Sequence, residues 1–127
     1  MSLEHTAAIM DGYWSGHDPE AVAEDAVFVD LASGRTWEGR EAIAGMLTYM
    51  YETVFSAEFI PERTHIADGS AAVEGRFVGT HIGEFGGVAA TGKDVDVPLA
   101  VFYTVEDRGI TEGRVWFMFS TFLQQVT

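Results

Sequence analysis

The chain has 127 residues, of which 47% are hydrophobic and 13% aromatic, and it contains no cysteine. This length fits one domain with a core of its own, and the lack of cysteine excludes disulfide bonds and zinc–thiolate sites. The formal net charge of -13 repels polyanions, so we expect no binding to nucleic acid or to anionic membranes. No run approaches the roughly 20 apolar residues that span a bilayer, and no signal peptide is recognisable, so we expect a cytoplasmic protein.

The N-terminal half is predicted to be mainly helical. Apolar residues recur at three- and four-residue steps from about Glu4 to Trp14, which indicates an amphipathic helix. Asp18 followed by Pro19 is typical of a helix start, so we expect a short second helix over 19–23. The run AVFVDLA predicts a strand over 26–32, and SGRTWEGR indicates a turn. The apolar spacing that follows predicts the longest helix, over 40–55.

The C-terminal half has the composition of strands. They are expected over 58–66, 71–82, 94–106 and 109–120, separated by ADGS, GEFGGVAATGK and EDRG. The short EDRG connection indicates an antiparallel hairpin. Because the helices come early and the strands late, the pattern predicts an α+β fold with an antiparallel sheet. If this sheet curves, it forms a cone whose mouth can hold a ligand, and the glycine-rich segment before Lys93 is a loop able to cover that mouth.

Several segments carry a resemblance to a known family. GTHIGEF, TGKDVDVP and VFYTVEDRGITEGRVWF resemble the C-terminal half of the SnoaL-like polyketide cyclases, which belong to the nuclear-transport-factor-2-like superfamily. WSGHDPEAVAEDAVFVDLASGRTWEGREAIAGML is similar to the superfamily's earlier half. The resemblance implies one SnoaL-like domain over 1–127, in which a cone-shaped, curved antiparallel or mixed sheet packs on three N-terminal helices.

The same resemblance implies a range of functions. Members close polyketide rings by aldol addition, isomerise steroids, open epoxides or only bind ligands, and none of these reactions needs a metal or an organic cofactor. The resemblance also implies a hydrophobic pocket and a homodimer formed through the outer face of the sheet.

Two departures from the family pattern stand out. The cyclases carry a general acid/base aspartate in the last strand, and the matching positions here are Val115 and Met118, which cannot transfer a proton. Ketosteroid isomerases use a first-strand aspartate, which matches Asp30. Their two oxyanion partners fall at Met10 and Ala100 and are therefore absent. The site of either relative is only partly present.

Asp30 is the first candidate for a catalytic residue. It follows the apolar run AVFV, and a carboxylate that is partly desolvated there would be a better base for removing a proton next to a carbonyl. The alternative is that Asp30 caps the strand end by bonding to nearby backbone amides.

His81 is the second catalytic candidate, and His65 a weaker one. In the strand over 71–82, alternation puts Val73, Phe77 and His81 on one face, which suits a pocket wall, and Glu74 and Arg76 on the other. A histidine at a pocket can protonate an oxyanion or orient a substrate. The alternative is a surface or hydrogen-bonded histidine.

A group of aromatic and flexible side chains is expected to bind the substrate, although the same residues would equally describe a filled core. These candidates are Trp14, Trp37, Met46, Tyr49, Met50, Phe59, His65, Phe77, Phe102 and Phe117. No H-x-H, H-x-x-x-H or H-E-x-x-H spacing occurs, so we expect no metal.

The outer face of the sheet is predicted from the polar alternation. Asp94 and Asp96 alternate with valines and indicate a solvated face at the start of their strand. One face of the last strand mixes apolar and charged residues, and if exposed it would need a partner, so we expect a homodimer. This stripe consists of Ile110, Glu112, Arg114, Trp116 and Met118.

The sequence therefore predicts a SnoaL-like cyclase or isomerase that acts on a hydrophobic, carbonyl-bearing small molecule by cofactor-independent proton transfer. Two alternatives remain. The chain is either a non-catalytic binding or accessory protein of the same fold, or a structural oligomer with a packed interior, which a cavity volume distinguishes.

Overall fold

Six strands form one mixed sheet in the computed structural model, which describes residues 1–127. The spatial order is β2-β1-β6-β5-β4-β3. Neighbouring strands are antiparallel except β1 and β6, which run parallel. The bounds are β1 Val22–Asp30, β2 Thr36–Glu38, β3 Phe55–Ala67, β4 Ser70–His81, β5 Asp94–Glu106 and β6 Gly109–Phe117.

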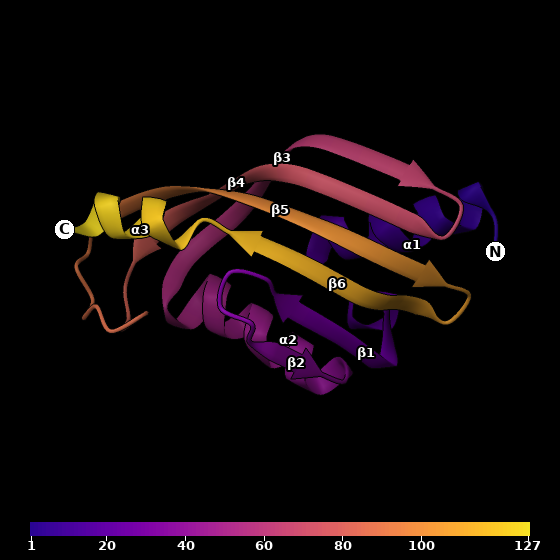
Figure 1. The fold of residues 1–127 in the computed structure, drawn as a ribbon, viewed down its shortest axis with the longest axis horizontal. Coiled ribbons are helices and arrows are strands. Elements are labelled where there is room, and N and C mark those ends of the chain that lie inside the picture. Colours follow the sequence, from indigo (N-terminus) through magenta and orange to yellow (C-terminus); the bar gives the residue numbers. More distant parts are fainter.

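The helices lie against the curved sheet (Figure 1). They are α1 Leu3–Gly16, the 3₁₀ turn Pro19–Ala21, α2 Arg40–Thr48, which continues into a π-helical turn Tyr49–Thr53, and α3 Phe119–Val126. The Ser2 side chain caps α1 by accepting a hydrogen bond from the His5 backbone N–H. The buried face of α1 consists of Thr6, Met10 and Tyr13, so its amphipathic pattern directs Tyr13 toward the sheet.

Two glycines in β4 allow β3 to approach it closely. A Cβ at Gly75 would overlap the carbonyl oxygen of Ile60, and one at Gly79 would overlap that of Ser56. A bulge also interrupts the pairing between Pro61 and Arg63 of β3, and bulges bend the strand that carries them. These features let the long strands curve, and the curvature leaves room under the sheet.

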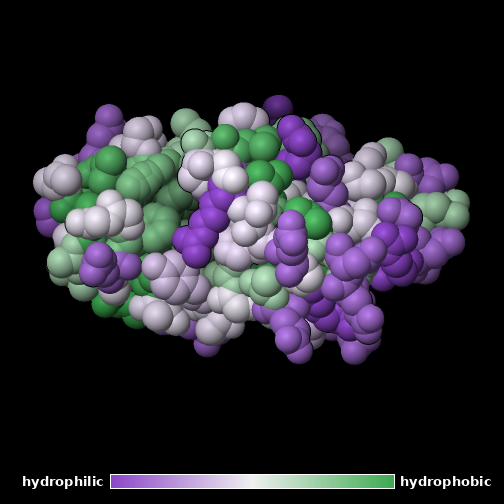
Figure 2. Space-filling view, turned by 60° about the horizontal axis from the view of Figure 1, so that its bottom comes forward, coloured by the Kyte–Doolittle hydropathy of each residue, from purple (hydrophilic) through white to green (hydrophobic).

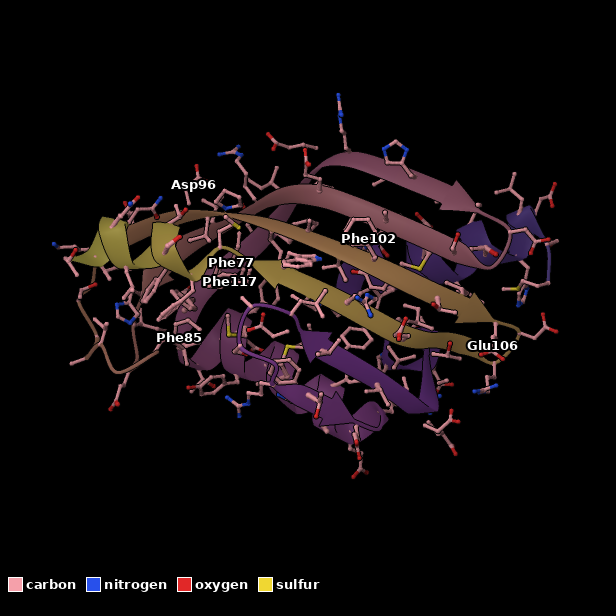
Figure 3. All side chains as sticks on the ribbon, in the orientation of Figure 1. Phe77, Phe85, Asp96, Phe102, Glu106 and Phe117 are labelled. Carbon is pink, nitrogen blue, oxygen red and sulfur yellow. The ribbon has the colours of Figure 1, made fainter.

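Aromatic side chains fill one end of the concave side. Phe55 packs edge-to-face against Phe77 and Phe122, with ring centroids 5.0 and 5.5 Å apart. Phe77 packs in the same way on Phe117 at 5.5 Å, and Figure 3 shows Phe77, Phe85 and Phe117 gathered under the strands. Such pairs contribute about 1 kcal/mol each beyond their buried area, so this end of the interior is solid.

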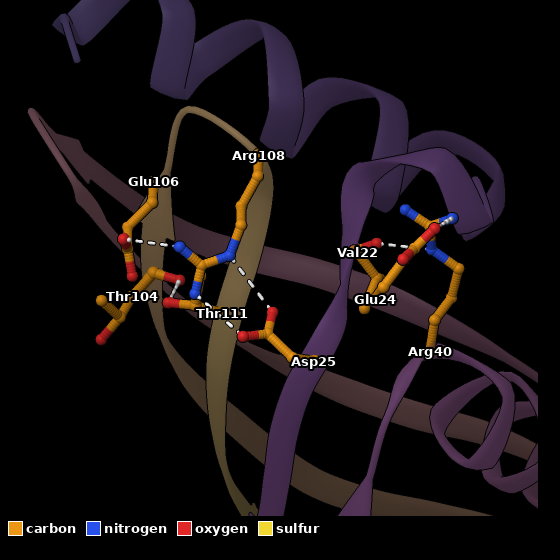
Figure 4. Close-up of polar contacts among 8 residues, drawn as sticks. All are labelled: Val22, Glu24, Asp25, Arg40, Thr104, Glu106, Arg108 and Thr111. Carbon is orange, nitrogen blue, oxygen red and sulfur yellow. Dashed lines mark hydrogen bonds and ion pairs between the residues drawn. The ribbon is translucent and has the colours of Figure 1, made fainter.

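An ion pair secures the other end of the sheet (Figure 4). Arg108, in the turn between β5 and β6, donates two hydrogen bonds to the Asp25 carboxylate of β1 at 3.1 and 3.2 Å. It donates a third to Glu106 at 3.0 Å. This contact joins β1 to the β5–β6 hairpin, whose strand β6 runs parallel to β1.

The α+β class, the curved mixed sheet and the three N-terminal helical segments agree with the sequence prediction. Several boundaries differ. The short second helix, predicted over 19–23, is the 3₁₀ turn Pro19–Ala21, and the strand predicted over 26–32 is Val22–Asp30. The predicted last strand stops at Phe117, and α3 follows it. The predicted turn at 33–40 contains the short edge strand β2, and the predicted helix over 40–55 ends at Thr48 and changes to π geometry.

The outer face of the sheet is polar where the sequence predicts it. Arg76 forms ion pairs with Asp96 at 2.6 Å and with Glu62 at 3.4 Å, and Thr80 donates a hydrogen bond to Asp94. The predicted stripe on β6 is broken at its start. Ile110 is fully buried, because a bulge between β5 and β6 shifts the alternation there.

Candidate functional site

A cavity of about 1130 Å³ lies between the concave face of the sheet and the helices. It is lined by 30 residues, of which 21 are hydrophobic. Ligand pockets usually measure about 300–1,000 Å³, so this one has room for a large ring system. The space-filling view in Figure 2 shows hydrophobic side chains concentrated toward the end where α3 lies in Figure 1, and hydrophilic ones crowding the opposite end. The volume of this cavity favours an open interior over a packed one.

Asp30 is half-buried in the cavity wall, at the C-terminal end of β1. Its Cα pairs with that of Val115 across the parallel ladder. The carboxylate accepts hydrogen bonds from the Ala32 backbone N–H at 3.1 Å and from the Ser33 hydroxyl at 3.0 Å. Asp30 thus caps the strand end and also lines the cavity, so the two sequence-based interpretations of it are compatible.

Two further charged residues line the cavity, Arg35 and Glu58. The Arg35 guanidinium carbon lies 5.4 Å from the centre of the Trp37 ring, a cation–π distance. No Lys lines the cavity, and Arg35 is its single cationic side chain. Asp30, Arg35 and Glu58 are therefore the charged residues of a cavity whose lining is mostly hydrophobic.

Three tyrosines form a polar group within the apolar lining. Tyr13 comes from α1, Tyr51 from the π turn and Tyr103 from β5. Tyr13 and Tyr103 are only 3% and 6% exposed, and their ring centroids are 5.8 Å apart. The hydroxyls of Tyr13 and Tyr51 have no hydrogen-bond partner within the protein, and the Tyr103 hydroxyl faces the indole of Trp14, which lowers the pKa of this phenol against the larger effect of burial. Three phenol donors are thus available to a molecule in the cavity.

Burial keeps these phenols protonated. It raises the pKa of Tyr13 well above the usual value, and the neighbouring Tyr103 and Tyr51 raise it further. Burial likewise raises the pKa of Tyr51 and of Tyr103. A phenol that stays neutral can donate a hydrogen bond to a developing negative charge.

The indole N–H of Trp14 is also buried without an acceptor. Its ring lies 6.1 Å from that of Tyr103, centre to centre, and lines the cavity. A buried donor of this kind is costly unless something accepts its hydrogen bond, so it adds a fourth N–H or O–H group for a ligand.

His17 is the histidine that lines the cavity. It follows α1 as its C-cap and is half-buried. Its ring lies between Tyr13 and Tyr51, at centroid distances of 5.2 and 5.0 Å. Burial lowers the pKa of His17 below its usual value of 6.5, so the ring is neutral at neutral pH.

His81 has a different position from the one expected. It is 0% exposed but does not line the cavity, because its ring is enclosed by Phe55 and Phe122. Its Nδ1 accepts a hydrogen bond from the Thr91 backbone N–H at 3.3 Å and lies 2.9 Å from the Thr91 hydroxyl. The structure therefore does not bring His81 together with Asp30, and His81 instead holds the start of the glycine-rich loop to its end.

Most of the other predicted contact residues do line the cavity. They are Trp14, Trp37, Met46, Tyr49, Met50, Phe59, Phe77 and Phe117.

Phe102 and His65 are exceptions. The expectation that Phe102 lines the interior is wrong: it is 51% exposed on the outer face (Figure 3), because it has the same parity in β5 as Asp94 and Asp96. His65 is exposed on the edge strand β3 and does not reach the cavity.

The sequence prediction omits four of the polar cavity residues: Tyr13, His17, Tyr51 and Tyr103. The position of Tyr103 could be predicted from the alternation along β5. Tyr103 lies two residues after Val101 and four after Leu99, so all three side chains point to the inner face of the sheet. Tyr13 lies three residues after Met10 on the buried face of α1. No periodic pattern marks His17, which lies in the break after that helix.

No group of three His, Asp or Glu side chains is arranged to hold a metal ion. None of the helices combines the length and the hydrophobicity needed to cross a bilayer. The expected cytoplasmic location stays a prediction.

The six-stranded curved sheet with helices over its hollow side defines a protein of the ketosteroid isomerase-like fold. The model of the SnoaL-like polyketide cyclase family matches residues 5–126, so the chain belongs to this family. No curated protein sequence matches the chain.

Solved structures of the same fold are distant in sequence. A candidate SnoaL-like polyketide cyclase from Jannaschia sp. CCS1 is 19% identical over 97% of this chain and 92% of its own, with a TM-score of 0.84. A candidate polyketide cyclase from Xanthomonas campestris is 21% identical over 98% of both chains, with a TM-score of 0.84. A protein from Catenulispora acidiphila with a ketosteroid isomerase-like fold, in complex with trimethylamine, is 21% identical over 99% of this chain and 94% of its own, with a TM-score of 0.73.

The lowered pKa of His17 predicts a pH-dependent stability. As the pH falls below about 6.5, the unfolded chain protonates this ring before the folded chain does, so the His17 contribution opposes folding. The wild type should therefore lose more stability between pH 7.5 and pH 5.5 than His17→Asn does. Urea unfolding of both proteins at both pH values measures this difference. An equal change in the two proteins would contradict the burial of the ring.

Proposed function

We propose that this protein is a cyclase or isomerase that moves a proton on a hydrophobic, carbonyl-bearing small molecule. The observation that carries the proposal is that one half-buried carboxylate and three phenols line the same apolar cavity. A base and a set of hydrogen-bond donors are the two components that proton abstraction next to a carbonyl requires.

In this mechanism Asp30 is the base. Its carboxylate removes a proton from the carbon next to the substrate carbonyl, and the electron pair moves to the carbonyl oxygen as an enolate. The hydrogen bonds from Ala32 and Ser33 fix the carboxylate in position, and a carboxylate has acceptor sites left for the substrate proton. In an isomerase the proton returns at another carbon. In a cyclase the enolate carbon attacks a second carbonyl group of the same molecule.

The phenols stabilise the oxyanion that forms. Tyr13, Tyr51 and Tyr103 come from three different elements, so their directions are set by the core and not by one flexible loop. In an apolar cavity a hydrogen bond to a developing charge is stronger than in water. In this proposal the three tyrosines take the place of the two oxyanion-binding residues of ketosteroid isomerases, whose positions are occupied here by Met10 and Ala100.

The alternative is a binding protein of the same fold that has no turnover. Val115 lines the cavity where the cyclases place their acid, and it adjoins Asp30. A structural neighbour was crystallised with trimethylamine, which supports ligand binding by this fold without chemistry. Asp30 distinguishes the two functions, because a binder does not need its charge.

Replacing Asp30 by Asn should abolish proton abstraction. The probe is 2-tetralone in D₂O, whose protons next to the carbonyl exchange for deuterium when a base removes them, as NMR records. Loss of the base should lower the enzyme-dependent exchange rate by at least about 100-fold. The matched control is Asp94→Asn, which removes an exposed carboxylate that also accepts a hydroxyl hydrogen bond. Full exchange in the folded Asp30→Asn protein would remove Asp30 from the mechanism.

Replacing Tyr103 by Phe should remove a donor and keep the packing. Phe preserves the ring contacts with Tyr13 and Phe28, so the melting temperature should change little. The exchange rate should fall by about 100-fold, as when one oxyanion donor is lost. 2-Naphthol, a phenol of similar shape to the enol, should bind more weakly in a fluorescence titration. Unchanged exchange and unchanged binding would show that this hydroxyl does not contact the ligand.

We also propose a homodimer that covers the outer face of the sheet. Phe102 and Trp116, on the adjacent strands β5 and β6, are 51% and 44% exposed. Two large aromatic side chains on one open sheet face are typical of an interface core.

The double variant Phe102→Glu, Trp116→Glu should be monomeric, because like charges would meet across the interface. Sedimentation at micromolar concentration should give a dimer for the wild type and a monomer for the variant. The control is Leu3→Glu, which adds the same charge at an exposed apolar residue of α1, away from the outer face of the sheet. A monomeric wild type would contradict the dimer and leave the cavity chemistry unaffected.

A further inference from the structure

We propose that His17 transfers protons between the main cavity and a second, smaller pocket on the protein surface. This inference rests on the proposed function, because it supplies the proton that the oxyanion of that reaction needs. The sequence pattern assigns His17 no role, and the mechanism above does not use it.

The first support is the position of the ring in a shared wall. The second pocket has a volume of about 260 Å³ and lies beside the main cavity. Four residues line both spaces: Gly16, His17, Leu47 and Tyr51. Of these, His17 and Tyr51 carry titratable groups, and an imidazole is the one that both accepts and donates protons near neutral pH.

The second support is that the ring nitrogens are free. The ring lies between Tyr13 and Tyr51, and neither of its nitrogens forms a hydrogen bond within the protein, whereas Nε2 of His5 and Nδ1 of His81 each have a partner. Because burial lowers the pKa of His17, the neutral ring predominates at neutral pH. A neutral imidazole has one donor and one acceptor nitrogen, as transfer between two sides of a wall requires.

The third support is the backbone at His17. It has φ 51° and ψ 46°, and it is the single residue other than glycine with a positive φ. Its N–H and that of Asp18 bond back to Tyr13 and Gly12, which is a Schellman-type helix end. Glycine is the favoured residue at such a position, so the backbone conformation alone does not explain why a histidine stands there.

The second pocket provides a polar environment for water. Arg40 and Glu52 line it, and Arg40 donates a hydrogen bond to the Val22 carbonyl at 2.7 Å (Figure 4). The titratable groups near His17 are Tyr13 from α1, Asp18 next to it in the chain, Tyr51 and Glu52 from the π turn, and Arg40 from α2. Arg40 and Glu52 bring charges of opposite sign to the second pocket.

The proton transfer balances as follows. Asp30 takes a proton from the carbon next to the carbonyl, and the electron pair moves onto the carbonyl oxygen. The N–H of His17 gives its proton to that oxygen, and the other ring nitrogen takes a proton from water in the second pocket. Asp30 releases its proton to water at the cavity mouth, and this neutralises the hydroxide left in the second pocket. The product is the enol, and the reverse steps return the ketone.

The test uses two variants that suit the backbone. His17→Asn keeps a residue that tolerates positive φ, and His17→Gly matches the conformation best. Both should fold and bind 2-naphthol, and both should exchange 2-tetralone protons about 100-fold more slowly than the wild type. Imidazole added to His17→Gly should restore exchange, but it should not restore exchange in Asp30→Asn. The control, His65→Asn, removes an exposed histidine outside the cavity and should be unaffected.

The outcomes separate this inference from the proposed function. Wild-type exchange in both His17 variants, together with loss in Asp30→Asn, overturns the role of His17 and retains Asp30 as the base. A rate loss in His17→Gly that imidazole does not restore makes His17 structural and also overturns the inference.

A second readout does not depend on turnover. In NMR spectra of the histidine rings, the His17 signals should shift both with solvent pH and with 2-naphthol, whereas those of His65 should shift with pH alone. If the His17 signals respond to solvent pH alone or to 2-naphthol alone, the ring does not connect the main cavity with the second pocket, and that result also overturns the proposal.

Discussion

The parallel ladder between β1 and β6 joins the beginning of the chain to its end. Helix α2, the π turn and strands β3 to β5 all lie in the connection between these two strands, so closing it orders most of the molecule at a cost in chain entropy. The ladder puts Asp30 beside Val115 on the cavity side, and the Arg108–Asp25 ion pair strengthens its opposite end. Without this pairing the carboxylate would have no cavity to face.

The cavity has few polar groups, because most of its lining is apolar. Water is a strong competitor for hydrogen bonds, and an apolar wall removes that competition. The indole N–H of Trp14 is buried in this space without a hydrogen-bond partner, which is an unfavourable state for a buried donor. A ligand oxygen that accepted this hydrogen bond would remove that cost, so this group favours the occupied form of the cavity.

Alternation along single strands was sufficient to predict much of the sheet. It separates Val73 and Phe77 from Glu74 and Arg76 correctly, and parity with Asp96 puts Phe102 on the outer face in spite of its hydrophobicity. Alternation fails at Ile110 because a bulge depends on the partner strand. The residue pattern alone does not predict the hollow interior, since the apolar residues of a cavity and of a filled core have the same pattern, and only the family resemblance implies it. His17 could not be found from spacing, because its role depends on two pockets that exist only in the folded chain.

The π-helical turn at Tyr49–Thr53 has a consequence for how this fold can diversify. A π turn holds one residue more than an α-helical turn, and its closing hydrogen bond here runs from the Val54 N–H to the Tyr49 carbonyl at 2.9 Å. Deleting one residue would restore α-helical geometry and rotate the preceding side chains by about 100° relative to the sheet. This rotation would change which side chains of α2 and the π turn face the cavity, among them Met46, Leu47 and Tyr51. Gain or loss of a single codon at this point would thus alter one wall of the cavity without any change in the strand sequences.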